Sequence, residues 1–202
     1  MASIYDLKPA FQRLLRPLCR SLVGVGVTAN HVTVAAMVLS FATGACILGW
    51  PEARWPLLSV PGVLFLRMAL NAIDGMIARE HDMQTPLGAI LNELGDVLSD
   101  AAIYLPLAVV PAFRAELVVG LVLLGVISEM TGVVGVQIGA SRRYDGPMGK
   151  SDRAFMFGLV CLIVGFGVSA DPWVNWVMVA LVVLLIWTIV NRARRALSEI
   201  SS

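Results

Sequence analysis

Long apolar stretches separated by short polar ones make up most of the chain. Six of them carry few or no charges: Val32 to Trp50, Trp55 to Leu66, Ala101 to Phe113, Leu117 to Ser128, Ala154 to Ala170 and Pro172 to Val190. A helix that crosses a bilayer needs about 20 residues. The second stretch runs on to Arg79, the third begins near Pro86, and the fourth continues past Glu129 to Ala140. This pattern predicts an all-α integral membrane protein with six transmembrane helices.

The first 26 residues follow a different pattern. Apolar residues recur there at helical spacing with basic residues around them: Leu7, Phe11, Leu14, Leu15, Leu18 and Leu22, with Lys8, Arg13, Arg16 and Arg20. Such a segment is typical of an amphipathic helix in the membrane interface; the alternative is a soluble basic tail. We expect one membrane domain over residues 1–202, with an interfacial helix at 1–26, a six-helix bundle at 27–196 and a tail at 197–202.

Composition and charge agree with a membrane protein. Of the 202 residues, 58% are hydrophobic and 14% are charged, whereas a soluble domain carries roughly 25% charged residues. In a six-span arrangement, twelve Lys and Arg residues fall on one side and only Arg54 and Arg114 on the other. Cytoplasmic loops carry an excess of Lys and Arg. We therefore expect a multi-pass, bacterial-type inner membrane protein with both termini in the cytoplasm.

Polar residues interrupt the apolar pattern between positions 71 and 100. Two groups recur at helical spacing: Asn71, Asp74 and Ala78, then Asn92, Asp96 and Asp100. Residues three and four apart share one face of a helix, so two such helices facing each other would form an acidic, oxygen-lined cleft open to the cytoplasm. Oxygen ligands suit a hard divalent cation and, with it, a phosphate-bearing substrate. Polar groups inside a membrane are expensive and are functional by default.

This segment resembles the signature of the CDP-alcohol phosphotransferases. The signature reads Asp-x-x-Asp-Gly-x-x-Ala-Arg and, after a short gap, Gly-x-x-x-Asp-x-x-x-Asp. Six positions match it in type and spacing: Asp74, Gly75, Ala78, Arg79, Gly88 and Asp96. Two positions depart from it, because the first and third aspartates of the signature are Asn71 and Asn92 in this chain.

The resemblance implies an enzyme of phospholipid biosynthesis. It would transfer a phosphoalcohol group, with a phosphatidyl group as the expected one, from a CDP-alcohol lipid to an acceptor alcohol and release CMP. By the same resemblance, Asp74 is a metal ligand, Asp96 is the base or a metal-linked carboxylate, and Mg²⁺ or Mn²⁺ is the cofactor. The nucleotide would bind at five positions: Asp74, Gly75, Ala78, Arg79 and Gly88. The structural alternative is that Asp74 and Asp96 form buried ion pairs with Arg67 or Arg79.

The two asparagines change the charge of the expected metal site. Asp74 and Asp96 alone balance one divalent ion, and the side-chain oxygen of asparagine is uncharged. Either one metal binds, or a second binds weakly, or Glu93 and Asp100 supply the missing charge. Asp100 is the better candidate, because it lies one turn from Asp96 on the same face. The full candidate metal set is Asn71, Asp74, Asn92, Asp96 and Asp100.

Three basic residues are candidates for binding phosphate or the acceptor: Arg67, Lys150 and Arg153. Arg67 lies inside an apolar stretch, where it could clamp the pyrophosphate or neutralise Glu93, Asp100 or Glu129. Lys150 and Arg153 open the fifth apolar stretch beside the expected cleft. The alternative for that loop is ordinary cytoplasmic charge.

Partners follow from these assignments. We expect a CDP-alcohol donor, an acceptor alcohol, membrane lipids and no nucleic acid. A small-residue face at Gly132, Gly135 and Gly139 indicates close helix packing or, as a bolder interpretation, the seam of a homodimer. Two other functions stay open: a family-like protein that binds CDP-lipid or nucleotide but has lost catalysis through the asparagines, and a small transporter.

Overall fold

The computed structural model describes the backbone of residues 4–201 and the side chains of residues 11–201. All regular secondary structure within this range is helical, which confirms the all-α prediction. The elements are α1 (Ile4–Gly24), α2 (Ala29–Gly49), α3 (Arg54–Glu80), α4 (Pro86–Tyr104), the 3-10 helix η1 (Leu105–Val109), α5 (Ala115–Gln137), α6 (Lys150–Gly165) and α7 (Trp173–Ile200). Helix α7 therefore continues through most of the predicted tail at 197–202. The predicted roles of Leu7 and Lys8 lie outside the described side chains.

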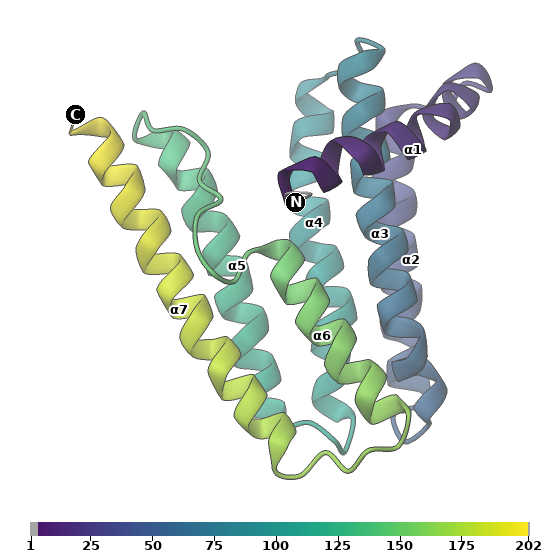
Figure 1. The fold of residues 1–202 in the computed structure, drawn as a ribbon, viewed down its shortest axis with the longest axis vertical. Coiled ribbons are helices and arrows are strands. Elements are labelled where there is room, and N and C mark those ends of the chain that lie inside the picture. Colours follow the sequence, from purple (N-terminus) through teal and green to yellow (C-terminus); the bar gives the residue numbers. More distant parts are fainter. Residues whose placement is uncertain (1–3, 202) are drawn as a thin grey trace.

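Helices α2 to α7 run side by side, and α1 lies across one end of them (Figure 1). Helix α2 packs against α3 and α4, α3 also packs against α6, and α5 packs against α7. The C-terminus and α1 lie at the same end of the bundle (Figure 1). Helix α6 begins well inside the bundle, so the connection from α5 runs back down the bundle before α6 starts (Figure 1). On the way it contacts α5 at Gly132 and α7 at Thr188.

Within residues 4–201, four helices are long and apolar enough to cross a membrane: α2, α3, α5 and α7. The other two helices of the bundle differ for identifiable reasons. Helix α4 has 19 residues and carries Glu93, Asp96 and Asp100, whereas α6 has only 16 residues and begins with Lys150, Asp152 and Arg153. These two helices thus carry much of the polar chemistry of the bundle.

Side-chain caps fix where the polar helices begin. Thr85 Oγ1 accepts a hydrogen bond from the Gly88 amide at 2.9 Å, and Pro86 follows as the first residue of α4. Proline suits this position because the first amide of a helix has no partner within the helix. At the start of α6, Asp152 Oδ2 accepts from the Gly149 amide at 2.9 Å. The caps set the register of Asp96 on α4 and of Lys150 on α6.

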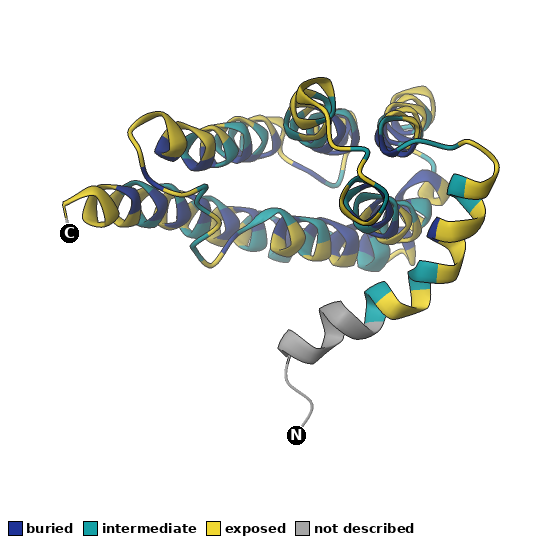
Figure 2. Cartoon of the chain, turned by 90° about the horizontal axis from the view of Figure 1, so that it is seen from above, coloured by how far each residue is buried: buried dark blue, intermediate teal, exposed yellow. Residues whose placement is uncertain are grey.

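Buried residues face the inside of the bundle and exposed residues cover its outside (Figure 2). At the centre, the rings of Tyr104 and Phe157 stack with 4.2 Å between centroids. Large apolar side chains such as Phe41, Leu123 and Trp187 lie exposed on the outside. A broad apolar exterior marks a surface that contacts another apolar phase, which for this bundle of long apolar helices is lipid.

Two glycines of the predicted small-residue face, Gly132 and Gly135, pack against the chain itself, whereas Gly139 lies beyond the end of α5 with nothing within 4 Å of its Cβ position. A side chain at Gly132 would collide with the Arg142 guanidinium, and one at Gly135 would lie 3.4 Å from the Ser141 carbonyl oxygen. The α5–α6 connection thus lies directly on this face. Of the two interpretations of the face, intramolecular packing is the one that these contacts support.

Candidate active site

Helices α3 and α4 bring two of the signature positions into direct contact. Asn71 Nδ2 donates a hydrogen bond to Asp96 Oδ1 at 3.0 Å. One turn earlier on α3, Arg67 Nη2 donates to the main-chain oxygen of Asp96 at 3.2 Å. The polar stripes of the two helices therefore face each other here, as the helical spacing predicts.

Asp74 is buried without a cation. The residue is 4% exposed, and its carboxylate accepts a hydrogen bond from Thr33 Oγ1 of α2 at 2.9 Å. Among the described residues, no Lys, Arg or His lies within ion-pair distance of Asp74. An ionised carboxylate is costly to bury unless it is paired or coordinates a metal. The arrangement therefore suits a cation bound at Asp74.

A cavity of about 410 Å³ lies between α3 and α6, and one of about 600 Å³ lies among α2, α3 and α4. The larger of these, hereafter the signature cavity, is lined by residues that include Thr33, Asp74, Gly75, Ala78, Arg79, Gly88 and Asn92. Six of these seven belong to the polar segment singled out in the sequence.

At two glycines of the signature cavity, another side chain comes so close to the backbone that a larger residue would collide with it. A Cβ atom at Gly88 would lie 2.8 Å from Asn30 Oδ1, and one at Gly75 would lie 3.2 Å from the Arg79 guanidinium. Both distances are too short for ordinary contacts. The Arg79 side chain is exposed and lies over Gly75, so it can reach a ligand in the signature cavity.

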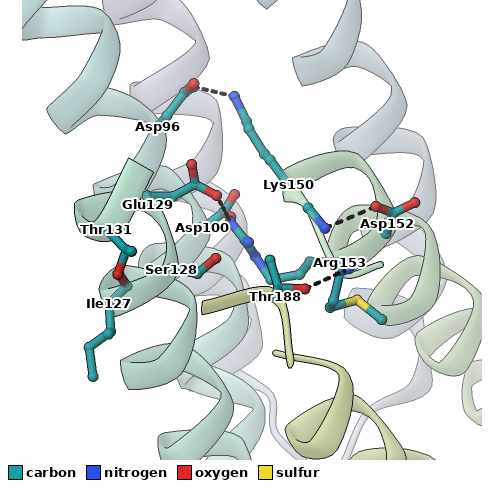
Figure 3. Close-up of polar contacts among 12 residues, drawn as sticks. Asp96, Asp100, Ile127, Ser128, Glu129, Thr131, Lys150, Asp152, Arg153 and Thr188 are labelled. Atoms are coloured by element: carbon teal, nitrogen blue, oxygen red, sulfur yellow. Dashed lines mark hydrogen bonds and ion pairs between the residues drawn. The ribbon is translucent and has the colours of Figure 1, made fainter. Parts of the chain in front are cut away.

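Asp96 is paired on its other side with α6. Lys150, the first residue of α6, forms an ion pair through Nζ with Asp96 Oδ1, and Figure 3 shows the lysine extending across to this carboxylate. The Asp96 side chain is 30% exposed, so a hydroxyl can still approach it. Asp96 therefore combines access for a substrate with a fixed orientation set by Asn71 and Lys150.

Asp100 has a different environment. Its Oδ1 accepts from Arg67 Nη2 at 2.5 Å and its Oδ2 from Arg153 Nη2 at 2.9 Å. The two arginine side chains are each 4% exposed. Both oxygens of Asp100 are thus engaged by buried arginines, and it is not among the residues that line the signature cavity.

The cavity between α3 and α6, hereafter the α3–α6 cavity, is mostly apolar. Its apolar wall includes Pro61, Leu64, Phe65, Phe155, Leu159 and Leu162, and five polar residues line it as well: Arg67, Asn71, Asp100, Lys150 and Ser151. Because α3 and α6 are antiparallel, these polar residues gather at the end nearest Asp96. An elongated apolar cavity with a polar end suits a ligand that has a headgroup and an apolar chain.

Some residues of the site were not singled out by the sequence. The sequence pattern did not mark out Thr33, yet its hydroxyl donates a hydrogen bond to Asp74. Glu93 pairs with Arg142 at 2.8 Å rather than with Arg67. Burial lowers the pKa of Arg142, but the hydrogen bonds and the charge of Glu93 outweigh burial, so its pKa lies above the usual value. The only sequence feature that could have pointed to Thr33 is that a polar residue interrupts an apolar helix.

The donor atoms around Asp74 fit a single hard cation. No group of three or more His, Cys, Asp or Glu side chains converges on one point among the described residues. The protein can offer the Asp74 carboxylate, and Asn30 and Asn92 line the same cavity. Carboxylate and amide oxygens are ligands suited to Mg²⁺ or Mn²⁺. Mg²⁺ sites often have few protein carboxylates because substrate phosphates and water complete the shell.

A polytopic helical bundle with this oxygen-lined site at one end defines a class of membrane-embedded transferase. Residues 26–191 match the profile of the CDP-alcohol phosphatidyltransferase family. The match spans most of the chain and includes the whole signature, so the chain belongs to this family. Membership confirms the predicted class of enzyme, one that transfers a phosphatidyl group from a CDP-alcohol.

Known relatives agree with this placement. The chain is 46% identical over 197 residues to inner membrane protein YnbA of Escherichia coli (strain K12), with 96% of each chain covered. It is 30% identical over 176 residues to phosphatidylinositol phosphate synthase of Mycobacterium marinum, covering 84% of this chain and 70% of the relative.

The fold also has solved counterparts. The Mycobacterium tuberculosis phosphatidylinositol phosphate synthase in complex with manganese and citrate superposes with a TM-score of 0.77 at 21% identity, covering 91% of this chain and 88% of the other. The same enzyme with CDP-DAG bound gives a TM-score of 0.72, covering 93% of both chains. At this identity the likeness establishes the fold.

Proposed function

We propose that the protein uses Mg²⁺ or Mn²⁺ to transfer a phosphatidyl group from a CDP-linked lipid to an alcohol, releasing CMP, in phospholipid biosynthesis. The observation that carries the proposal is Asp74, a buried carboxylate without a cation that lines the signature cavity. Such a group binds a metal readily. The manganese and the CDP-DAG named for the solved relatives support the same assignment.

The chemistry needs a base and a way to hold charged phosphates. The acceptor oxygen attacks the phosphorus of the phosphatidyl group, the bond from that phosphorus to the CMP oxygen breaks, and the hydroxyl proton goes to Asp96 Oδ2, since Oδ1 is held by Asn71 and Lys150. A bound divalent cation neutralises the charge that develops on the phosphate oxygens. Asp96 is therefore the proposed catalytic base.

The donor occupies the signature cavity in this proposal. Gly75, Ala78 and Gly88 let the nucleotide approach the backbone, and Arg79 contacts its pyrophosphate, a pairing that arginine geometry favours. The amide oxygens of Asn71 and Asn92 complete the protein ligands of a metal held by Asp74. The acyl chains of the donor then extend along the apolar wall of the α3–α6 cavity.

One metal ion per chain is the number that the charges favour. Asp74 lacks a cation, whereas Lys150 already neutralises Asp96 and two arginines neutralise Asp100. Of the predicted metal set, we therefore propose that Asp100 is structural. Arg67 and Arg153 both pair with Asp100. Of the three basic residues predicted to bind phosphate or the acceptor, Lys150 is therefore the one that reaches a donor phosphate.

We propose that α4 and α6 also cross the membrane, which gives six spans with the site facing the cytoplasm. Both helices expose apolar side chains on their outer faces, such as Leu94 and Leu98 of α4 and Phe155 of α6, whereas Asp100 and Arg153 are buried inside the bundle. Helix α1 lies in the cytoplasmic interface. It packs against α3, and Arg16 binds Glu80 through two hydrogen bonds of 3.1 and 2.8 Å. The name of the Escherichia coli relative supports an inner membrane location.

The test is CMP release from CDP-diacylglycerol by the purified protein with a panel of acceptor alcohols. Release should require Mg²⁺ or Mn²⁺ and should fall roughly 100-fold or more in Asp74→Ala and Asp96→Ala, the range that one base or metal ligand supplies. Glu116→Ala is the control, because Glu116 is 78% exposed near the start of α5. Full activity in EDTA or in Asp96→Ala would exclude this mechanism.

A second candidate follows from the two asparagines, which remove two carboxylates from the signature. A protein that has lost catalysis would bind CDP-diacylglycerol and release no CMP with any acceptor. Measuring nucleotide binding beside CMP release separates the two functions.

A further inference from the structure

A network of arginines and carboxylates lies one helical turn from Asp96, outside the signature cavity. We call it the arginine–carboxylate cluster; its members are Arg67, Asp100, Glu129, Arg142, Arg153 and Arg192. Glu129 of α5 is its centre. The Glu129 carboxylate contacts Arg153 at 3.1 Å, Arg192 at 3.3 Å and Arg142 at 3.5 Å, and Figure 3 shows it beside Asp100 and Arg153.

The centre of the cluster is largely shielded from solvent. The side chains of Arg153 and Arg192 are 4% and 2% exposed, and those of Asp100 and Glu129 are 13% and 12% exposed. Arg192 also donates to the main-chain oxygens of Ser128 at 2.6 Å and Asp145 at 3.2 Å. Most hydrogen-bond donors of these arginines are therefore used in contacts within the protein.

One donor in the cluster is unused. Arg153 Nη1 is buried without a hydrogen-bond partner among the described residues. The Arg153 side chain borders a small cavity of about 10 Å³ between α4, α5 and α6. A cavity of this size holds about one water molecule, so it has no room for a phosphate group.

The cluster reaches the place where an acceptor must bind. Asn71 and Lys150, the two side-chain partners of Asp96, line the polar end of the α3–α6 cavity together with Arg67 and Asp100. Both cations at this end already have a carboxylate partner, Arg67 with Asp100 and Lys150 with Asp96. An acceptor beside Asp96 therefore meets paired charges with no surplus arginine.

We propose that the acceptor is an uncharged, hydroxyl-bearing alcohol, and that Glu129 and Asp100 set this selectivity by occupying the arginines. A phosphate on the acceptor would have to displace a buried carboxylate and leave it without a partner, which is strongly unfavourable. A hydroxyl needs no such exchange, because it both donates and accepts hydrogen bonds. The inference rests on the proposed phosphatidyl transfer and names the class of its second substrate.

Matched pairs of acceptors test the proposal directly. Glycerol is compared with glycerol 3-phosphate, and myo-inositol with myo-inositol 1-phosphate, as acceptors for CMP release from CDP-diacylglycerol. In each pair that is used, the uncharged member should be favoured in kcat/KM by roughly tenfold or more, the factor expected for one unmatched charged contact. Preference for the phosphorylated member of either pair overturns the proposal.

Variants of Glu129 test the cause of the selectivity. Glu129→Ala frees the arginines and makes room, so the ratio should move roughly tenfold or more toward the phosphorylated acceptor. Glu129→Gln removes the charge with less risk to folding and should move the ratio in the same direction. Glu116→Ala, on the exposed part of the same helix, should leave the ratio unchanged. Unchanged ratios in both Glu129 variants refute the role of Glu129.

A binding measurement separates this proposal from the proposed activity. Inorganic phosphate should raise the melting temperature of Glu129→Ala or Glu129→Gln and leave that of the wild type unchanged, since only the variants offer unpaired arginines. If no acceptor gives CMP, the proposed activity fails, and the melting temperatures still decide whether the arginines are occupied. Stabilisation of the wild type by phosphate at the level of the variants overturns the inference.

Discussion

Asp74 and Asp100 are aspartates on the polar faces of α3 and α4, respectively, and their neighbours give them different environments. Asp74 has a threonine hydroxyl as its side-chain partner and lines a cavity, so it can accept a metal ion. Asp100 has two buried arginines, and its charge is already balanced. At the residue scale, function thus depends on which carboxylates the protein leaves without a cation.

Replacing Asp100 by Asn tests this distinction. Asp100→Asn should leave the affinity for Mn²⁺ within about threefold of wild type and should lower the free energy of unfolding by about 3 kcal/mol, because it leaves two buried arginines without part of their countercharge. Mn²⁺ titration and thermal unfolding in detergent measure the two effects. Loss of metal binding with unchanged stability would instead make Asp100 a ligand.

Restoring the signature aspartates tests the number of metals. The wild type should bind one Mn²⁺ per chain, because Lys150 holds Asp96 and the amides of Asn71 and Asn92 bring no charge. The double variant Asn71→Asp with Asn92→Asp adds two negative charges and should bind a second Mn²⁺. Electron paramagnetic resonance counts free against bound Mn²⁺ without reference to activity. Two equivalent ions in the wild type would contradict the one-metal site.

At the element scale, short and charged helices are placed among long apolar ones. Helix α4 carries three carboxylates in 19 residues, and α6 begins with three charged residues. The apolar stretches in the sequence predicted both helices. Apolar stretches alone could not show where α6 starts within the bundle, because that depends on the path of the α5–α6 connection over the glycines of α5.

The contact between α2 and α4 can be tested at one glycine. A Cβ atom at Gly44 would overlap the Ala102 carbonyl oxygen, which is backbone and cannot turn away. Gly44→Ala should therefore lower the free energy of unfolding by about 2 kcal/mol, within the usual range for overpacking. Gly62→Ala on α3 is the matched control, because nothing lies within 4 Å of its Cβ position. Thermal unfolding in detergent compares the two, and equal melting temperatures would exclude this close packing.

At the scale of the whole molecule, local patterns were readable and long-range pairings were not. Periodicity predicted the helices, and the family resemblance predicted the class of enzyme that the comparisons confirm. Asp96 pairs with Lys150, which lies on another helix. Glu129 pairs with three arginines that lie in the α5–α6 loop, on α6 and on α7. Such partners depend on how helices pack and on which charges compete. For that reason the sequence left several roles open for Arg67 and Asp100.

The arrangement of the whole chain across the membrane gives the last prediction. Single cysteines are introduced into a variant whose own cysteines are replaced by alanine, one in each connection from α2 to α7: Glu52→Cys, Asp82→Cys, Arg114→Cys, Tyr144→Cys and Ser169→Cys. All five positions are exposed. A membrane-impermeant maleimide should label positions 82 and 144 from the cytoplasmic side and positions 52, 114 and 169 from the opposite side, because the basic residues are concentrated on the cytoplasmic face.

Labelling of positions 82 and 114 from the same side would show that α4 does not cross the membrane. Labelling of positions 144 and 169 from the same side would show that α6 does not cross it. Position 82 labelled from the periplasm would invert the molecule and place the site on the wrong side for a cytoplasmic nucleotide.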